Sequence, residues 1–220
     1  MAVPKPILSD FDILPPARKL MEALSKGEEQ YQGEAKSKEA RRYRAIATDL
    51  IKKYNADDLF KPDSENLGRN VLHYAISTND TENALALINK TGVTAKQLFQ
   101  QDKFGFTPLH KAIEKGNGKV ASALINKPGV TADQLFKQDE YGFTPLHRAI
   151  EKNSQGLAML LIGKAGTNKN LQKTTKDPKK DALQIAKERH MHNQKTPWIH
   201  ITKGYFQNRP KAHRHDAIHN

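Results

Sequence analysis

Apolar residues recur three and four positions apart in short stretches of the chain, and polar residues border each stretch. Leu109, Ala112 and Ile113 form one such stripe, and Val120 and Leu124 form a second stripe shortly after it. Spacing of this kind places the apolar side chains on one face of an amphipathic helix. The pattern therefore predicts two short antiparallel helices that are joined by a turn and bury their apolar faces against each other.

This helix pair belongs to a unit that repeats every 37 residues. The heptad Thr107-Pro-Leu-His-Lys-Ala-Ile113 recurs as Thr144-Pro-Leu-His-Arg-Ala-Ile150, and 19 of 24 positions are identical between residues 92–115 and 129–152. The same apolar position of successive units holds Leu72, Leu109, Leu146 and Leu183. A fixed period of this size indicates a stack of supersecondary units rather than one globular core.

Local signals predict where these helices begin and end. Thr107 and Thr144 are N-cap candidates, and each precedes a proline at the first helical position, where no backbone N–H is needed. Gly116 is placed to end the first helix. The segment Thr131-Ala-Asp-Gln134 is a capping signature that predicts one extra helical turn. In Asp139-Glu-Tyr-Gly-Phe143, the glycine is placed for a left-handed turn that leads into the next unit.

Two further helices are predicted before the first clear unit. Residues 17–24 can form a short helix, and residues 35–54 carry a longer apolar stripe. The segment Asn55-Ala-Asp-Asp-Leu-Phe60 is similar to residues 131–136, so the longer helix stands where the second helix of a preceding unit would be. Since a repeat stack needs an end unit that shields its first apolar face, we expect this helix to cap the stack.

The repeated motif resembles the ankyrin repeat. Thr-Pro-Leu-His-x-Ala, a Gly-terminated helix, a second helix and an Asp-x-x-Gly turn follow one another as in that family. The resemblance implies an all-α fold, an ankyrin-type helix-turn-helix repeat solenoid with 37-residue units and helical end caps. The unit is four residues longer than the family's usual period of about 33. The motif fades in Asp181-Ala-Leu-Gln-Ile-Ala186, which lacks the Thr, Pro and His.

The expected organisation follows from the same register. It comprises an N-terminal segment with a short helix at 1–34, a capping half-repeat at 35–66, ankyrin repeats at 67–103, 104–140 and 141–177, a degenerate fourth repeat at 178–195, and a basic, His-rich tail at 196–220.

Composition limits the location and the chemistry. The chain of 220 residues contains no Cys, so disulfides and thiolate metal sites are impossible. Residues 1–10 lack the apolar stretch of a signal peptide, and no run of about 18 apolar residues could span a membrane. We therefore expect a cytoplasmic protein, and also a monomer. The small size, the missing Cys and the abundance of Lys, Asn and Gln also resemble the ankyrin effectors that intracellular bacterial pathogens secrete into host cells.

The net charge of +12 is concentrated near the C-terminal end, because thirteen Lys/Arg and four Asp/Glu from Lys164 onward contribute +9. Trp198, Tyr205 and Phe206 stand among these cations, and aromatics between cations can stack on bases while the charges bind phosphates. Nucleic-acid or acidic-membrane binding through this tail is therefore an alternative function. Residues 197–202 can equally fold back on the last unit's apolar face, and we favour that role for Trp198.

No specific catalytic, metal or cofactor site is predicted. His73, His110 and His147 recur at one place in the motif, and the resemblance gives this His a structural role in which it bridges Thr and backbone groups of neighbouring turns. Six further His lie in the last 31 residues, but no His-Glu-x-x-His arrangement accompanies them. An enzyme in the chain ends remains a third, less favoured class of function.

The favoured function is binding of a protein partner. In the ankyrin family the variable positions of the turns and first helices are exposed and line a concave recognition surface, where aromatic and Arg side chains are typical of binding hot spots. Phe106 and Phe143 are the strongest candidates, whereas Phe104 and Tyr141 can equally pack between turns. The candidate binding residues are Tyr74, Lys103, Phe104, Phe106, Lys111, Glu114, Tyr141, Phe143, Arg148 and Glu151.

Overall fold

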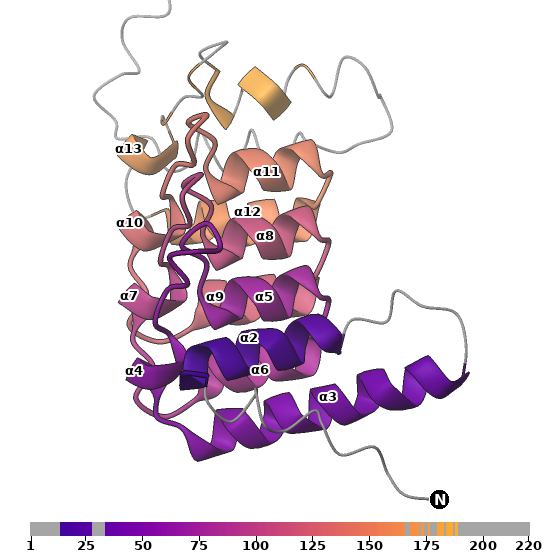
Figure 1. The fold of residues 1–220 in the computed structure, drawn as a ribbon. Helices are drawn as coiled ribbons and strands as arrows, with labels where there is room; N and C mark the ends of the chain where they lie inside the picture. The colour runs from indigo at the N-terminus through magenta and orange to yellow at the C-terminus, as the bar shows by residue number, and fades with distance from the viewer. Residues whose placement is uncertain are drawn as a thin grey trace, which may run out of the picture. The chain divides into compact units, whose positions relative to one another are not determined.

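The computed structural model describes residues 14–27, 34–165, 168–171, 173, 176, 180–182, 184–186 and 188. Within these residues the regular elements are helices (Figure 1), and an isolated β-bridge joins Asp63 to Arg69. The prediction of an all-α repeat solenoid is confirmed. Contacts within the chain divide it into two compact units, Met1–Leu124 and Ile125–Asn220.

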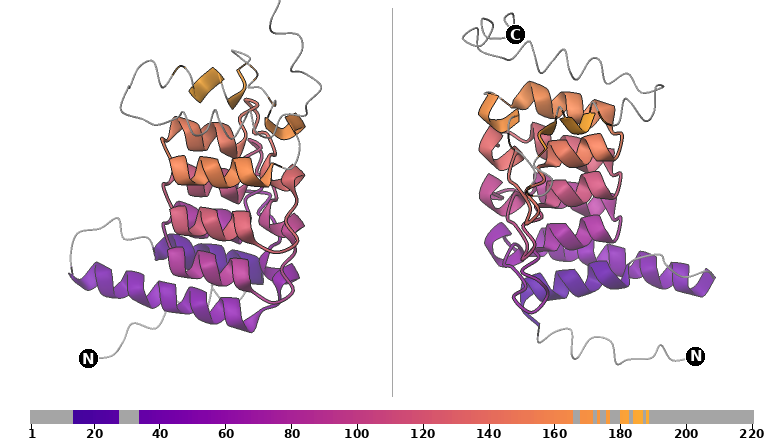
Figure 2. Two further views of the ribbon diagram at one scale, coloured as in Figure 1. Left: turned by 180° about the vertical axis from the view of Figure 1, so that it is seen from behind. Right: turned by 90° about the horizontal axis from the view of Figure 1, so that it is seen from above.

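The first unit consists of helical hairpins that pack on one another in two rows (Figures 1 and 2). α5 packs against α6 and α8, α2 packs on α5, and α3 packs on α6. The helices are α2 (Pro16–Lys26), α3 (Glu34–Lys53), α4 (Ala56–Leu59), α5 (Val71–Ser77), α6 (Thr81–Asn89), α7 (Ala95–Leu98), α8 (Pro108–Glu114) and most of α9 (Gly118–Asn126).

The second unit contains one further hairpin, in which α11 packs against α12. Its helices are α10 (Ala132–Leu135), α11 (Pro145–Glu151), α12 (Gln155–Lys164) and α13 (Asn168–Leu171). Residues 182, 184–186 and 188 are helical as well, where the sequence predicts the degenerate fourth repeat.

The N-terminal cap is a complete hairpin. α3 lies within one residue of the predicted helix at each end, and α2 forms the predicted short helix. α2 packs against both α3 and α5, so it acts as the first helix of the capping pair, although the sequence register assigns it to a separate segment. The 37-residue register does not predict this pairing because the connection between α2 and α3, residues 27–33, is longer than the turns between the paired helices of the repeats.

The buried residues recur with the same 37-residue period as the sequence motif. The motif leucines Leu72, Leu109 and Leu146 are at most 1% exposed, while Leu183 lies outside the described residues. The small position two residues after the motif His is fully buried in every unit, at Ala75, Ala112, Ala149 and Ala186. A side chain of this size lets the two helices of a hairpin approach closely. The buried Ala186 shows that the 37-residue register continues into the fourth repeat.

Each first helix begins with a reciprocal pair of hydrogen bonds. The His110 N–H donates to Thr107 Oγ1 (3.4 Å), and the Thr107 N–H donates to His110 Nδ1 (3.1 Å). Thr144 and His147 form the same pair in α11, with distances of 3.4 and 3.0 Å. Such a capping box satisfies two backbone N–H groups that have no partner within the helix.

The chemistry of this cap is retained where the motif residues change. In the first repeat Asn70 replaces Thr, and its Oδ1 atom accepts the N–H groups of Leu72 and His73 (both 3.2 Å). In the fourth repeat the Gln184 N–H donates to Asp181 Oδ1 and the Asp181 N–H donates to Gln184 Oε1 (both 2.8 Å). The apparent loss of the motif after residue 178 therefore leaves the cap intact.

Asn70 also links the first helix of its repeat to α7 at the end of the same repeat, because its Nδ2 group donates to the Gln97 carbonyl at 2.9 Å. We predict that Asn70→Ala lowers the free energy of unfolding by about 2 kcal/mol, since it removes a buried cap and this second bond. The matched control is Thr94→Ala at the exposed cap of α7, which should cost about 1 kcal/mol or less. Urea denaturation followed by circular dichroism measures both values, and equal losses would contradict the linking role of Asn70.

Candidate functional site

A buried aspartate holds the tip turn before α8. Asp102 Oδ1 accepts the N–H groups of Phe104 (3.0 Å) and Phe106 (2.9 Å), and the Asp102 N–H donates to the Phe106 carbonyl (2.9 Å). Gly105 has φ +76°, a left-handed conformation that the reversal of the chain requires. The turn therefore fixes Phe104 at its tip, where 38% of this residue is exposed.

The tip turn before α11 has the same construction in the second unit. Asp139 Oδ1 accepts the N–H groups of Tyr141 and Phe143 (both 2.9 Å), and Gly142 has φ +83°. The Lys176 N–H donates to the Tyr141 carbonyl at 2.7 Å, which fixes the tip further. Tyr141 is 56% exposed, the largest value among the exposed large apolar residues described.

Behind each tip, an aromatic ring lies between a histidine and a cation. The Phe106 ring meets His110 edge-on, with 5.8 Å between ring centroids, and Lys111 Nζ lies 4.3 Å from its centroid. A cation above a ring face is attracted by the ring's π electrons. Phe106 is consequently half-buried, and its exposed face is partly covered by Lys111. Lys111 also donates to Glu114 Oε2 at 2.9 Å.

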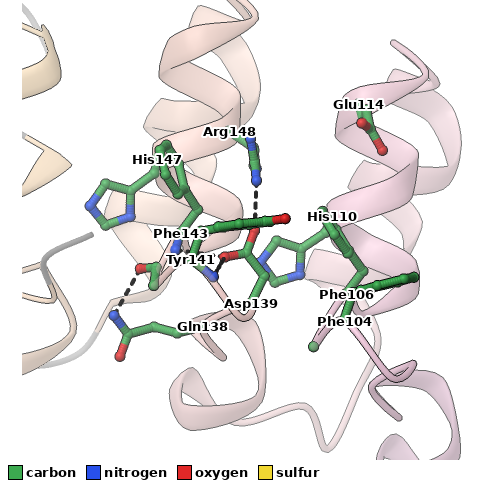
Figure 3. Close-up of polar contacts among 12 residues, drawn as sticks. Phe104, Phe106, His110, Glu114, Gln138, Asp139, Tyr141, Phe143, His147 and Arg148 are labelled. Atoms are coloured by element: carbon green, nitrogen blue, oxygen red, sulfur yellow. Dashed lines mark hydrogen bonds and ion pairs between the residues drawn. The ribbon is translucent and has the colours of Figure 1, made fainter. Parts of the chain in front are cut away.

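In the second unit an arginine makes this arrangement more rigid. Arg148 stacks 4.3 Å from the centroid of Phe143 and donates to the fully buried Asp139 carboxylate at 2.7 Å (Figure 3). A second bond, of 3.3 Å, runs from Arg148 to Glu151. Because a charge-assisted hydrogen bond to a buried carboxylate is strong, Arg148 ties the first helix to the tip turn. Lys111 forms no bond of this kind to the described atoms of Asp102.

In the first repeat the aromatic residue and the cation stand at each other's positions. Arg69 stands at the position of Phe106, and Tyr74 stands at the position of Lys111. Arg69 Nε lies 3.7 Å from Asp102 Oδ2, so its charge compensates the aspartate of the following tip turn. Tyr74 is half-buried, and burial raises the pKa of its hydroxyl above the usual value. Lys103 N–H donates to the Leu67 carbonyl at 2.8 Å, which joins consecutive tips within the first unit.

The structure distributes the predicted residues over the two units and ranks their exposure differently from the sequence hypothesis. Phe104 and Tyr141 are the exposed aromatics, whereas Phe106 and Phe143 are half-buried beneath their cations. The motif aspartates were expected only as turn residues, and Asp102, Asp139 and Arg69 were not among the predicted binding residues. Their recurrence two residues before the tip aromatic was the available signal for the aspartates. The first unit contributes Tyr74, Lys103, Phe104, Phe106, Lys111 and Glu114, and the second contributes Tyr141, Phe143, Arg148 and Glu151.

Within the two most similar stretches of the repeats, residues 92–115 and 129–152, all the differences lie at positions that are not buried. The five substituted positions in residues 92–115 and 129–152 are exposed or half-buried in both copies, and three of them lie in the tip turn or the first helix. The pairs are Lys96/Asp133, Gln100/Lys137, Lys103/Glu140, Phe104/Tyr141 and Lys111/Arg148. Within these stretches the buried residues are thus identical, and three of the five differences change the surface around the tips and first helices.

The motif histidines complete the caps of the first helices, and His73 and His147 are neutral near pH 7. A backbone N–H points at Nδ1 of His73, so the ring proton lies on Nε2, which donates to the Phe106 carbonyl of the next tip at 3.0 Å. Burial lowers the pKa of His73 to about 4, an effect that the Phe106 carbonyl and Asp102 only partly offset. Burial likewise lowers the pKa of His147 to about 4. Its Nε2 atom has no hydrogen-bond partner among the described residues.

Among the described residues, no cluster of His, Asp or Glu could hold a metal ion, and no helix is long and apolar enough to cross a membrane. The six C-terminal histidines, Trp198 and the basic tail at 196–220 lie outside the described residues.

Comparison with known families identifies the repeats. A family model described as ankyrin repeats, in three copies, matches residues 93–173. These residues are ankyrin repeats. The match covers over a third of the chain, and no curated protein matches it. Most of the first unit's Asn70-capped repeat lies before the match, although that repeat has the same cap and buried core. Ankyrin repeats are in general modules for protein–protein interaction.

The buried histidines predict a loss of stability in acid. The unfolded state takes up protons near pH 6.5 and the folded state only near pH 4, so between these values the unfolded state binds more protons. The free energy of unfolding therefore falls as the pH drops from about 6.5 to 4, by up to about 3 kcal/mol for each histidine. Urea midpoints measured across this range test the prediction.

His147→Gln is the informative variant, because it reproduces the Thr-x-x-Gln capping box that Thr131 and Gln134 form before α10. We expect it to remove one histidine's share of the pH dependence while the fold is retained. His73→Gln should also flatten the curve, but with lower stability at every pH, because the bond to the Phe106 carbonyl is lost. A His147→Gln curve as steep as that of the parent would show that His147 is not the titrating group.

Proposed function

We propose that this chain is a non-enzymatic interaction module that binds a protein partner through its tip turns and first helices, the side expected to be concave in ankyrin repeats. The observation that supports the proposal most directly is the pair of exposed aromatics, Phe104 and Tyr141. They are two of the three exposed large apolar residues among those described, and they occupy the same repeat position. Single apolar residues scattered over a surface are normal and need no explanation. Two exposed aromatics at the same position of successive repeats are not a scattered pattern.

The rigidity of the tips makes these aromatics suitable anchors. Each is the tip residue of a turn that a buried aspartate closes with two backbone hydrogen bonds. An aromatic side chain loses few rotamers on binding, and a fixed backbone loses little conformational entropy. A partner with an apolar pocket would therefore gain most of the burial energy of the ring.

The cations behind the tips favour a partner with mixed chemistry. Lys111 is already paired with Glu114, and Arg148 is paired with Asp139 and Glu151, so α8 and α11 each present a compensated cation beside the aromatic tip. Such pairs can exchange hydrogen bonds with a polar rim without a large cost of desolvation. We expect a partner surface with apolar pockets surrounded by polar groups, which is the usual anatomy of a protein interface.

Photo-crosslinking at the tips tests this proposal. A benzophenone amino acid at position 104 or 141 should crosslink one partner in cells, which mass spectrometry identifies. With the purified partner, we predict that the double variant Phe104→Ala/Tyr141→Ala weakens Kd at least about thirtyfold, corresponding to about 2 kcal/mol. Thermal stability should remain nearly unchanged, because both residues are exposed.

Two controls sharpen this test. Lys96→Ala and Asp133→Ala replace exposed residues at another repeated position, away from the tips, and should leave Kd unchanged. Phe106→Ala and Phe143→Ala should weaken binding as well, but with a loss of stability, because these rings pack on the motif histidines. Full-affinity binding by the tip double variant would place recognition on another surface.

The alternative function, nucleic-acid or acidic-membrane attachment, depends on the tail at 196–220. It predicts an affinity that falls steeply with salt and vanishes when the chain is truncated after residue 195. A tip-mediated protein complex should survive that truncation, so the two proposals give opposite results with the same truncated protein.

A further inference from the structure

The second helix of a repeat has one side that the next repeat covers. In the first unit, Thr48 of α3 donates its hydroxyl hydrogen to Asn83 Oδ1 of α6 at 2.8 Å, and Asn83 Nδ2 donates to the Arg44 carbonyl at 3.2 Å. Asn83 is only 2% exposed. Thr48 therefore marks the position on a second helix that faces the following second helix.

In α12 the equivalent position is apolar and uncovered. Successive steps of 37 residues lead from Thr48 to Leu85, Ser122 and Met159. The first three are half-buried, but Met159 is 41% exposed. Its neighbours one turn away, Gly156 and Gly163, are exposed and uncharged.

A helix that lacks charged residues on its outer side is normally covered. The end units of repeat stacks, in contrast, usually present a polar outer face. No second helix follows α12 among the described residues, so the stack has an apolar end where a cap is expected.

The sequence register supplies a candidate for the cover. The fully buried leucine of the second helices, at Leu87, Leu124 and Leu161, aligns 37 residues later with Trp198, and the following isoleucine aligns with Ile199. Thr196 and Pro197 match the residues preferred at the N-cap and at the first position of a helix. A helix that begins at Pro197 would contain Trp198 and Ile199.

The chain is long enough for this return. The seven residues between Glu188 and Thr196 can span up to about 25 Å, whereas packed helices lie about 10 Å apart. The remainder of the tail is basic, and the exposed side of α12 carries no carboxylate to attract it. The apolar pair, rather than the cations, fits this surface.

We propose that residues 196–202 dock on α12, with Trp198 and Ile199 covering Met159, and so complete the second half of the fourth repeat. The docked indole would be withdrawn from solvent and could not stack on a nucleic-acid base. This assignment is independent of the proposed partner-binding surface, because it concerns the opposite row of helices.

The full-length chain carries its own probe, because Trp198 is its one tryptophan. We expect the blue-shifted emission of a buried indole and slow acrylamide quenching, in contrast to a synthetic peptide of residues 196–202. Met159→Glu should shift the emission to that of the peptide and raise the quenching constant several-fold. Because Met159 is 41% exposed on the outer side of α12, its replacement should release only the docked segment and leave the helical circular dichroism signal nearly unchanged. The milder Met159→Gln should give a smaller shift in the same direction.

Asn89→Glu is the control, since it adds the same charge at an exposed position of the second helix α6 and should leave the emission unchanged. The proposal is overturned if the parent chain already emits like the peptide. It is equally overturned if Met159→Glu retains the blue emission, because the indole would then be buried elsewhere. Blue emission that disappears on dilution would assign the cover to a second copy of the chain, which also overturns docking within one chain.

Discussion

The reciprocal hydrogen bonds at the start of each first helix are the interaction on which the repeats depend. α5, α8 and α11 have seven residues each, far fewer than a helix needs to persist alone in water. In a helix this short, most backbone N–H groups belong to the unsatisfied first turn. The capping box satisfies two of these groups inside the core, and in α5 the buried His73 that completes it also reaches the next tip through Nε2. Cap, helix and stacking are therefore one cooperative unit.

This dependence explains which substitutions the repeats tolerate. The capping pair is Thr–His in α8 and α11, Asn–His in α5, and Asp–Gln in the fourth repeat. What is retained is an acceptor at the N-cap and a side chain three residues later that accepts the N-cap N–H. A consensus motif counts letters, so it misses the fourth repeat, whereas the hydrogen bonds and the buried Ala186 identify it.

The periodic elements were predictable because period, cap and turn signals agree in residues 92–152. The N-terminal hairpin was only partly predictable, since α2 joins α3 through a longer connection that interrupts the register. For the candidate binding residues, the sequence named positions but not their geometry. Phe104 is more exposed than Phe106 because the Lys111 side chain extends over the Phe106 ring. The Arg148–Asp139 ion pair requires the several N–H donors of a guanidinium group, which lysine lacks. Neither follows from spacing alone.

Near-identity of the two central repeats has a consequence for recognition. A buried aspartate closes both tip turns in the same way, so both tips hold an aromatic residue in the same local turn geometry. Yet the neighbouring position changes from Lys103 to Glu140, which reverses its charge. Under the proposed function, a charged partner group that is attracted to one tip would be repelled at the other, which disfavours a partner with two identical contact groups. The tips would then suit different parts of one asymmetric partner, and the variable positions beside them would supply the specificity.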